Sequence, residues 1–237
     1  MKIFNPFTTT GGAGSLTFSQ GTWGTTAGAV STVSLAYTSN VTAGNLLLFM
    51  NTANSTNTFN TPTDTLGNTW VSITTSTHTT ALQQVWWCIA NGSGANTVTC
   101  TIATGGASGM NPVVAEFTVA GSAPTVDGYG SGSSANATTV SATSSSASGA
   151  ADLVLAFCIN SYGGVTNPSG YTQRVADTQG GGPYVMLSTK TASGSGTQSA
   201  TFGCTQNSLA IACAIVVNFQ PGSGSSVASS ANYVIGG

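Results

Sequence analysis

The chain contains very little charge. Lys and Arg together number 3 and Asp and Glu number 5 in 237 residues, and there is one histidine, so the net charge at pH 7 is −2. A nucleic-acid surface needs several Lys or Arg side chains on one face, and a basic membrane-surface helix has the same need. The composition therefore excludes both classes of partner. With so few titrating groups, the free energy of unfolding should change little with pH.

The chain is also poor in residues that favour helices. Glu, Lys and Arg are nearly absent, whereas Thr and Val, which suit a half-buried pleated sheet, are plentiful. The apolar fraction of 40% is sufficient for a folded core. The longest apolar runs, NLLLFM and LAIACAIVVNF, are too short to span a bilayer. The start MKIFNPF lacks the apolar run of a signal peptide, which predicts assembly in the cytoplasm.

The sequence contains an internal repeat, in which several short patterns recur in the same order. Residues 90–99 (ANGSGANTVT) match 192–201 (ASGSGTQSAT), 45–48 (NLLL) match 152–155 (DLVL), and 67–70 (GNTW) match 168–171 (PSGY). Colinear matches of this kind indicate a tandem duplication. We therefore predict an all-β fold of two antiparallel β-sandwiches, jelly-roll or Ig-like, over residues 16–121 and 122–222.

Clusters of Gly, Asn and Ser divide each half into about seven strands, the spacing of a sandwich. In the first half they are expected near residues 17–23, 30–38, 45–53, 69–75, 81–91, 96–104 and 111–120. In the second half they are expected near residues 125–129, 137–143, 152–160, 170–177, 183–192, 197–205 and 209–220. The segments ANGSGANTVT and ASGSGTQSAT would then be hairpin loops, in which Gly94 and Gly196 supply positive φ.

No combination of residues in the sequence predicts catalysis. The single histidine, His78, has Asp64 as its nearest acid, and no G-x-S-x-G nucleophile motif occurs. A glycosidase needs two facing carboxylates. Asp152 and Asp177 are the candidates, but both lie at strand ends, where acids commonly cap or face water. Calcium and zinc patterns are also missing, so we expect a non-catalytic protein without a cofactor.

The five cysteines allow two interpretations. If the loop around Gly94 is a symmetric hairpin, Cys88 lies opposite Cys100 and a cross-strand disulfide is geometrically allowed. Cys204 and Cys213 lie on successive expected strands and could also meet. The alternative, which we favour, is that the cysteines are small buried apolar residues.

Trp86 and Trp87 are adjacent on one expected strand, so their side chains must point to opposite faces. One of them therefore lies outside the core of its own sandwich. The options are a junction between the two sandwiches, a contact with another subunit, or a platform for carbohydrate. Because aromatic residues are enriched at interfaces, we favour the junction or the subunit contact.

The two ends, residues 1–15 and 223–237, fall outside the repeats, and each joins a short apolar stretch to a Gly-rich linker. We predict that they are arms that dock on a neighbouring copy, the alternative being free tails. The predicted contact residues are Ile3, Phe4, Phe7, Tyr233, Val234 and Ile235. Sheet edges are normally protected from pairing with other chains by charged side chains. Because this chain has few charged residues, its edges should associate readily, which also favours a homo-oligomer or a lattice component.

The patterns AGNLLL, DTLGNTW, GANTVT and VVAEFTVAG, followed by DLVLAF, GYTQRV and VVNF, resemble a group of tandem β-sandwich proteins. That group occurs among structural proteins of tailed phages and among uncharacterised bacterial surface proteins. The resemblance implies a fold and a structural role, and it supplies no catalytic residue. We therefore expect a virion protein, a capsid decoration protein that binds copies of itself and a major capsid protein. The alternatives are a secreted adhesin or filament subunit and a carbohydrate-binding module.

Overall fold

The computed structural model describes residues 14–26, 28–54, 56–145, 149, 151–161, 163–177, 183–205 and 211–222, with the backbone alone at 211. Every regular element within these residues is a β-strand, so the prediction of an all-β chain is confirmed. No helix in this part of the chain is long and apolar enough to cross a membrane. The predicted arm residues Ile3, Phe4, Phe7, Tyr233, Val234 and Ile235 lie outside the described residues.

The first half of the chain forms a large and a small antiparallel sheet. The large sheet has, in spatial order, β1 (Ser15–Trp23), β9 (Val113–Ala120), β3 (Leu46–Ala53), β7 (Ala81–Ile89) and β6 (Val71–His78). The small sheet has β2 (Thr32–Ala36), β8 (Thr97–Thr104) and β4 (Thr58–Phe59), and β5 (Thr63–Asp64) also pairs with β8.

The second half repeats this arrangement. Its large sheet has β10 (Thr125–Ala135), β17 (Ile211–Gln220), β12 (Leu153–Asn160), β15 (Tyr184–Thr191) and β14 (Thr172–Ala176). Its small sheet has β11 (Thr139–Thr143), β16 (Ser199–Cys204) and β13 (Val165–Thr166). Taken in chain order within each half, corresponding strands occupy the same places in both large sheets and in both small sheets.

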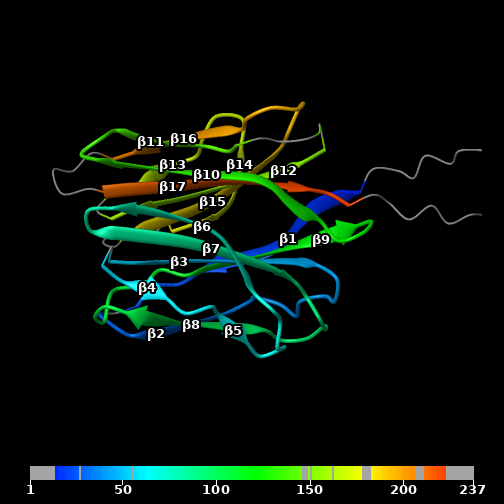
Figure 1. Ribbon diagram of the computed structural model, residues 1–237, viewed down its shortest axis with the longest axis horizontal. Coiled ribbons are helices and arrows are strands. Elements are labelled where there is room, and N and C mark those ends of the chain that lie inside the picture. Colours follow the sequence, from blue (N-terminus) through cyan, green and yellow to red (C-terminus); the bar gives the residue numbers. More distant parts are fainter. Residues whose placement is uncertain are drawn as a thin grey trace, which may run out of the picture.

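The four sheets stack in layers, with the two large sheets in the middle and a small sheet on each outer side (Figure 1). Three apolar clusters fill the spaces between the layers. One cluster contains Phe49 and Trp86 and lies inside the first half, and a second contains Phe202 and lies inside the second half. The third joins Leu46 and Leu48 of β3 to residues of β12 and β17, so the two large sheets pack against each other.

This stacking explains the two most apolar stretches of the sequence. Every residue of β3 (LLLFMNTA) and of β12 (LVLAFCIN) is buried. Both strands are central in a sheet that is covered on both faces, and strands of that kind have continuous rather than alternating hydrophobicity. Alternate residues of each strand therefore belong to different apolar clusters.

The segments ANGSGANTVT and ASGSGTQSAT connect sheets rather than forming hairpins, which corrects the prediction. β7 pairs with β3 and β6, whereas β8 pairs with β2, β4 and β5 in the facing sheet. The glycine prediction does hold at the two equivalent positions, since φ is 148° at Gly94 and 118° at Gly196. Both connections reverse direction at a glycine while they pass from one layer to the next.

The outer faces of the small sheets carry pairs of hydroxyl groups. Ser34 and Thr99 are 2.8 Å apart across β2 and β8, and Ser141 and Thr201 are 2.8 Å apart across β11 and β16. Such cross-strand pairs stabilise a sheet in place of ion pairs. The polar character of these faces therefore comes from hydroxyl groups.

Candidate interaction surface

An apolar groove lies where the edges of the two large sheets meet. Val71 and Ile73 from β6, Trp87 from β7, and Val126 and Tyr129 from β10 line it, and its volume is about 400 Å³. Val71 is 50% exposed and Tyr129 is 48% exposed, and they are the exposed large hydrophobic residues of the described chain. A contiguous apolar patch of this kind commonly marks a site of interaction.

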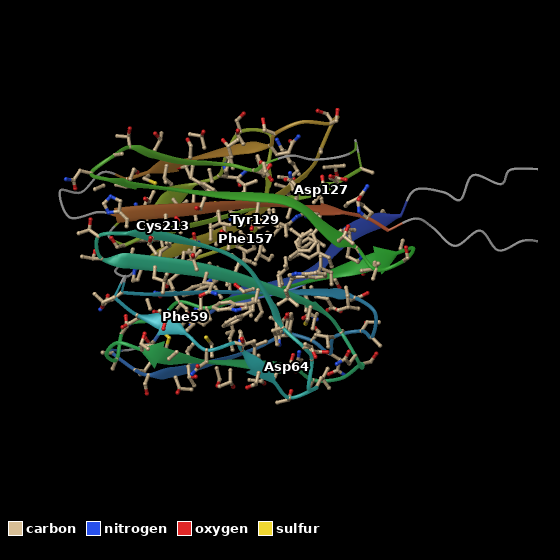
Figure 2. All side chains as sticks on the ribbon, in the orientation of Figure 1. Phe59, Asp64, Asp127, Tyr129, Phe157 and Cys213 are labelled. Carbon is tan, nitrogen blue, oxygen red and sulfur yellow. The ribbon has the colours of Figure 1, made fainter. Side chains whose placement is uncertain are left out.

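Two edge strands border the groove. β6 and β10 are the edge strands of their sheets, and the Ser76 hydroxyl donates a hydrogen bond of 2.9 Å to the carbonyl oxygen of Gly132, which joins the two edges. Figure 2 shows Tyr129 at the level where the two large sheets meet, well away from Asp64 on the small-sheet side. The groove is therefore a feature of the junction between the halves.

Trp86 and Trp87 point to opposite faces of β7, as their adjacency requires. Trp86 is 1% exposed and packs inside the first half, with its ring centre 5.6 Å from that of Phe49. Trp87 faces the junction, and its ring meets Phe219 of β17 edge-on at 5.4 Å. Part of Trp87 remains accessible and forms the floor of the groove. Of the two predicted interface aromatics, Trp87 is the one at a surface that a ligand can reach.

The sequence did not identify Val71, Ile73, Val126 or Tyr129 as candidate residues. Ile73 is the extra residue of a β-bulge, because the pairing of β6 with β7 shifts register between Ser72 and Thr74. Bulges redirect a side chain at a sheet edge. The pairing partner of a strand decides where its bulge falls, so no local pattern in the sequence predicts this orientation.

The five cysteines are free thiols. The geometric premise of a Cys88–Cys100 disulfide is wrong, because the two residues lie on strands of different sheets. In the register Cys88 faces Leu47 of β3, and Cys100 faces Val33 of β2. Both side chains belong to the apolar cluster between the sheets, as the interpretation of cysteines as buried apolar residues predicts.

The thiols should react poorly in the folded protein. Burial raises the pKa of Cys100 to about 12 and that of Cys213 to about 11, and it raises the pKa of Cys88 and Cys158 further. A hydrogen bond from Cys158 lowers the pKa of Cys204, against the effect of burial. A thiol reagent at pH 8 should label Cys204 alone, and slowly, until denaturant exposes the other four. Rapid labelling of all five thiols in the native protein would contradict this.

Asp64 organises the loop that follows β5. Its carboxylate accepts hydrogen bonds from the backbone N–H of Leu66 and Asn68, at 3.2 and 3.0 Å. It also accepts from the side chains of Asn68, Trp70 and Asn96, at 2.7, 3.1 and 3.2 Å. Burial acts to raise the pKa of Asp64, but the hydrogen bonds together outweigh it and lower the pKa below its ordinary value of 3.8.

Asp64 should therefore give the protein a small acid sensitivity. A carboxyl group whose pKa is lower in the folded state stabilises the protein above its unfolded pKa, and this stabilisation disappears as the pH falls through the folded pKa. Because the carboxyl is partly open to solvent, the effect should be below about 1 kcal/mol. Urea unfolding between pH 5 and 2 should show this decline in the natural chain and a flatter profile in Asp64→Asn. Identical profiles would contradict the role given to Asp64.

Glu116 is also used to hold the structure together. Its side chain is 1% exposed, and its carboxylate accepts hydrogen bonds from the Thr42 backbone N–H at 2.8 Å and from the Asn45 and Gln20 side chains. On β9 the Glu116 side chain points away from Ala115 and Phe117, because successive residues of a strand face opposite sides. That opposite face is covered by the small sheet, and it is therefore buried rather than solvated.

The remaining titratable candidates do not converge on one site. His78 ends β6, and its Nδ1 lies 3.0 Å from the Thr79 hydroxyl. Asp152 is buried immediately before β12, while Asp177 follows β14, where its backbone N–H donates to the carbonyl oxygen of Val185. Within the described residues, no group of three or more His, Cys, Asp or Glu side chains could hold a metal ion.

Comparisons with protein-family models, with curated proteins and with solved structures found no match to this chain.

Proposed function

We propose that this chain is a non-catalytic structural protein of a virion, a capsid decoration protein that binds copies of itself and a major capsid protein. The observation that carries the proposal is the exposed apolar groove of Val71, Ile73, Trp87, Val126 and Tyr129. It interrupts a surface that carries few charged side chains and many hydroxyl groups. A protein that acts by attachment to a lattice needs such a patch, because apolar surface contributes most of the free energy of association.

We also infer that the two halves, 16–121 and 122–222, arose by tandem duplication. The shared spatial order of strands supports this inference, as do the recurring sequence patterns and the equivalent positive-φ glycines Gly94 and Gly196. A fused pair of sandwiches provides a rigid spacer between the two outer faces. That property suits a protein that stands on a lattice and presents a surface outward.

Cosedimentation with particles assembled from the major capsid protein of the same genome tests the proposal. The full chain should pellet with the particles, and the double variant Val71→Ser/Tyr129→Ser should lose most of this binding. The matched control is Thr201→Ala, which changes an exposed residue on the outer face of a small sheet and should bind like the natural chain. Equal binding by all three chains would show that the groove does not mediate attachment to the capsid. No binding by any of them would show that the chain is not a capsid-binding protein.

A second candidate function is binding of carbohydrate in the same groove. It is favoured by one observation, the presence of the two aromatic side chains Trp87 and Tyr129 in a single accessible groove. Sugar rings pack on aromatic faces, which combine apolar area with a polar edge. Glycan-array binding that is lost in Tyr129→Ser, together with no cosedimentation with capsids, would favour this function over the virion role.

A further inference from the structure

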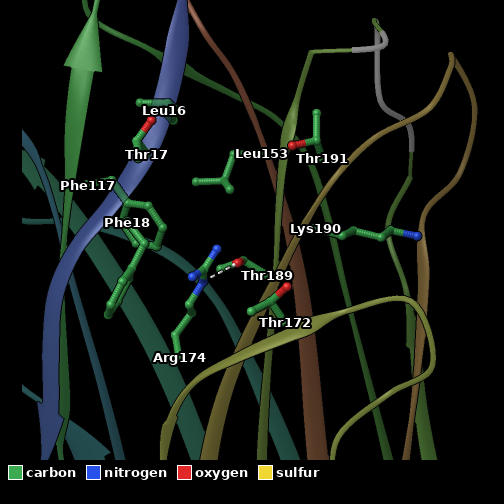
Figure 3. A pocket seen from close by; sticks show the side chains of 10 residues that line it. All are labelled: Leu16, Thr17, Phe18, Phe117, Leu153, Thr172, Arg174, Thr189, Lys190 and Thr191. Carbon is green, nitrogen blue, oxygen red and sulfur yellow. Dashed lines mark hydrogen bonds between the residues drawn. The ribbon is translucent and has the colours of Figure 1, made fainter.

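A second pocket lies at the other edge of the junction between the two large sheets (Figure 3). It has a volume of about 190 Å³ and is lined by residues of both halves. The lining residues are Leu16, Thr17, Phe18, Phe117, Leu153, Thr172, Arg174, Thr189, Lys190 and Thr191. Its lining combines apolar side chains with the hydroxyl groups of threonines, and none of its lining residues is acidic.

This pocket corresponds in position to the apolar groove. In the first half Val71 pairs with Trp87 across β6 and β7, and in the second half Thr172 pairs with Thr189 across β14 and β15. The bulges match as well, since the pairing of β14 shifts register around Arg174, as that of β6 does around Ile73. The same strand positions therefore form an aromatic groove at one edge and a cationic pocket at the other.

Two of the cationic residues of the chain line this pocket. Lys and Arg number 3 in the sequence, and Arg174 and Lys190 both line this one cavity. They are oriented differently, as Figure 3 shows. The Lys190 ammonium lies 4.7 Å from the ring centre of Tyr171, outside the pocket lining, whereas Arg174 points between Phe18 and Thr189. Arg174 is therefore the cation available to a ligand.

Two contacts with described residues hold Arg174 in place. Its Nε donates a hydrogen bond of 2.8 Å to the hydroxyl of Thr189, a residue that is only 2% exposed. Its guanidinium carbon lies 5.1 Å from the ring centre of Phe18, in a cation–π contact. The two terminal nitrogens make no hydrogen bond to any residue in the described ranges. A guanidinium fixed in this way presents a planar pair of donors that matches a carboxylate.

We propose that this pocket binds a sugar acid, with the carboxylate on the terminal nitrogens of Arg174 and the ring hydroxyls on the surrounding threonines. The size of the pocket restricts the ligand, because sites for drug-sized molecules occupy roughly 300–1,000 Å³. A single ring with one carboxylate suits the smaller space. The apolar side chains of Leu16, Phe18 and Leu153 in the lining would contact part of the face of such a ring. This site is independent of the capsid-binding groove.

Titration calorimetry of the full chain with three probes tests the proposal. Sodium glucuronate carries both the carboxylate and the hydroxyls, glucose lacks the carboxylate, and acetate lacks the ring. Glucuronate should bind at least tenfold more tightly than either of the other two. If acetate binds as tightly as glucuronate, the pocket does not recognise the ring. If glucose binds as tightly as glucuronate, Arg174 does not recognise the carboxylate. If glucuronate does not bind, the proposed site is wrong.

Three substitutions complete the test. Arg174→Gln should weaken glucuronate binding by more than tenfold, and Arg174→Lys, which keeps the charge but loses the paired donors, should weaken it by about tenfold. Lys190→Gln is the matched control, because it removes a nearby positive charge that lies on the ring of Tyr171 rather than in the cavity. It should change the affinity by less than about twofold. Thermal unfolding of each variant shows whether the fold is retained. Unchanged affinity in a folded Arg174→Gln chain would overturn the proposal.

Because the source of a sugar acid is either a free monosaccharide or a residue within a polysaccharide, a fourth probe separates the two. An oligogalacturonide should bind if the pocket admits a residue within a chain. If the monosaccharide binds and the oligosaccharide does not, the pocket accepts the free acid alone. Either result keeps the sugar acid as the ligand and identifies its source.

Discussion

Replacing Gly132 by alanine should destabilise the protein by about 3 kcal/mol, the upper end of the usual cost of overpacking. A Cβ atom built on Gly132 would overlap the backbone carbonyl oxygen of Ser141, and one built on Gly130 would overlap that of Thr143. These two glycines of β10 let the edge strand of the second large sheet lie directly against β11 of the small sheet. The clash is with backbone, so no rotation of a side chain can relieve it, and the edge of the sandwich must open.

Gly194→Ala is the matched control for this prediction. A Cβ at Gly194 would have nothing within 4 Å, and its φ lies outside the left-handed region. The unfolding free energy of Gly194→Ala in urea should differ from that of the natural chain by less than about 1 kcal/mol. A small gain is expected, because alanine reduces the conformational entropy of the unfolded chain. If Gly132→Ala and Gly194→Ala unfold at the same urea concentration, the close contact between β10 and β11 is incorrect.

Phe157→Ala should cost about 3–5 kcal/mol, the usual cost of removing a buried aromatic ring. Phe157 is 1% exposed and lies in the cluster between the two large sheets, where β12 meets residues of the first half. This cost is expected only if the two halves share one core. Contacts between separate domains are usually smaller and more polar, and the loss of one ring from such a contact would cost much less.

Phe202→Ala provides the comparison. Phe202 is also fully buried, but its contacts lie within the second half. We expect similar losses of unfolding free energy for Phe157→Ala and Phe202→Ala, and a single unfolding transition of the natural chain by calorimetry. A loss below about 1 kcal/mol for Phe157→Ala, or two separate transitions of the natural chain, would show that the halves fold independently.

The strand positions were the part of the fold that the sequence predicted best. The expected strands near residues 45–53 and 152–160 coincide with β3 and β12, because two-sided burial makes both of them uninterrupted apolar runs. The short strands β4, β5 and β13 were not expected, since each contains two residues and has no periodicity to detect. Local patterns thus identified the strands that carry the core.

The pairing of strands was harder to predict, and the candidate sites depend on it. A loop such as the one around Gly94 has the composition of a hairpin turn whether its strands pair or separate into two sheets. The adjacency of Trp86 and Trp87 did predict that one of them would leave the core of its own half. The contribution of Tyr129 to the groove and of Arg174 to the pocket depends on β-bulges and on contacts between the two halves. The residues that make these contacts lie far apart in the sequence, so local patterns do not predict them.

The most direct test of the virion proposal is quantitative mass spectrometry of purified particles encoded by the genome that carries this sequence. We predict that the chain is present in intact, nuclease-treated and salt-washed particles at a fixed ratio to the major capsid protein. Its recovery only from cells or culture medium, with none in the particles, would contradict the account.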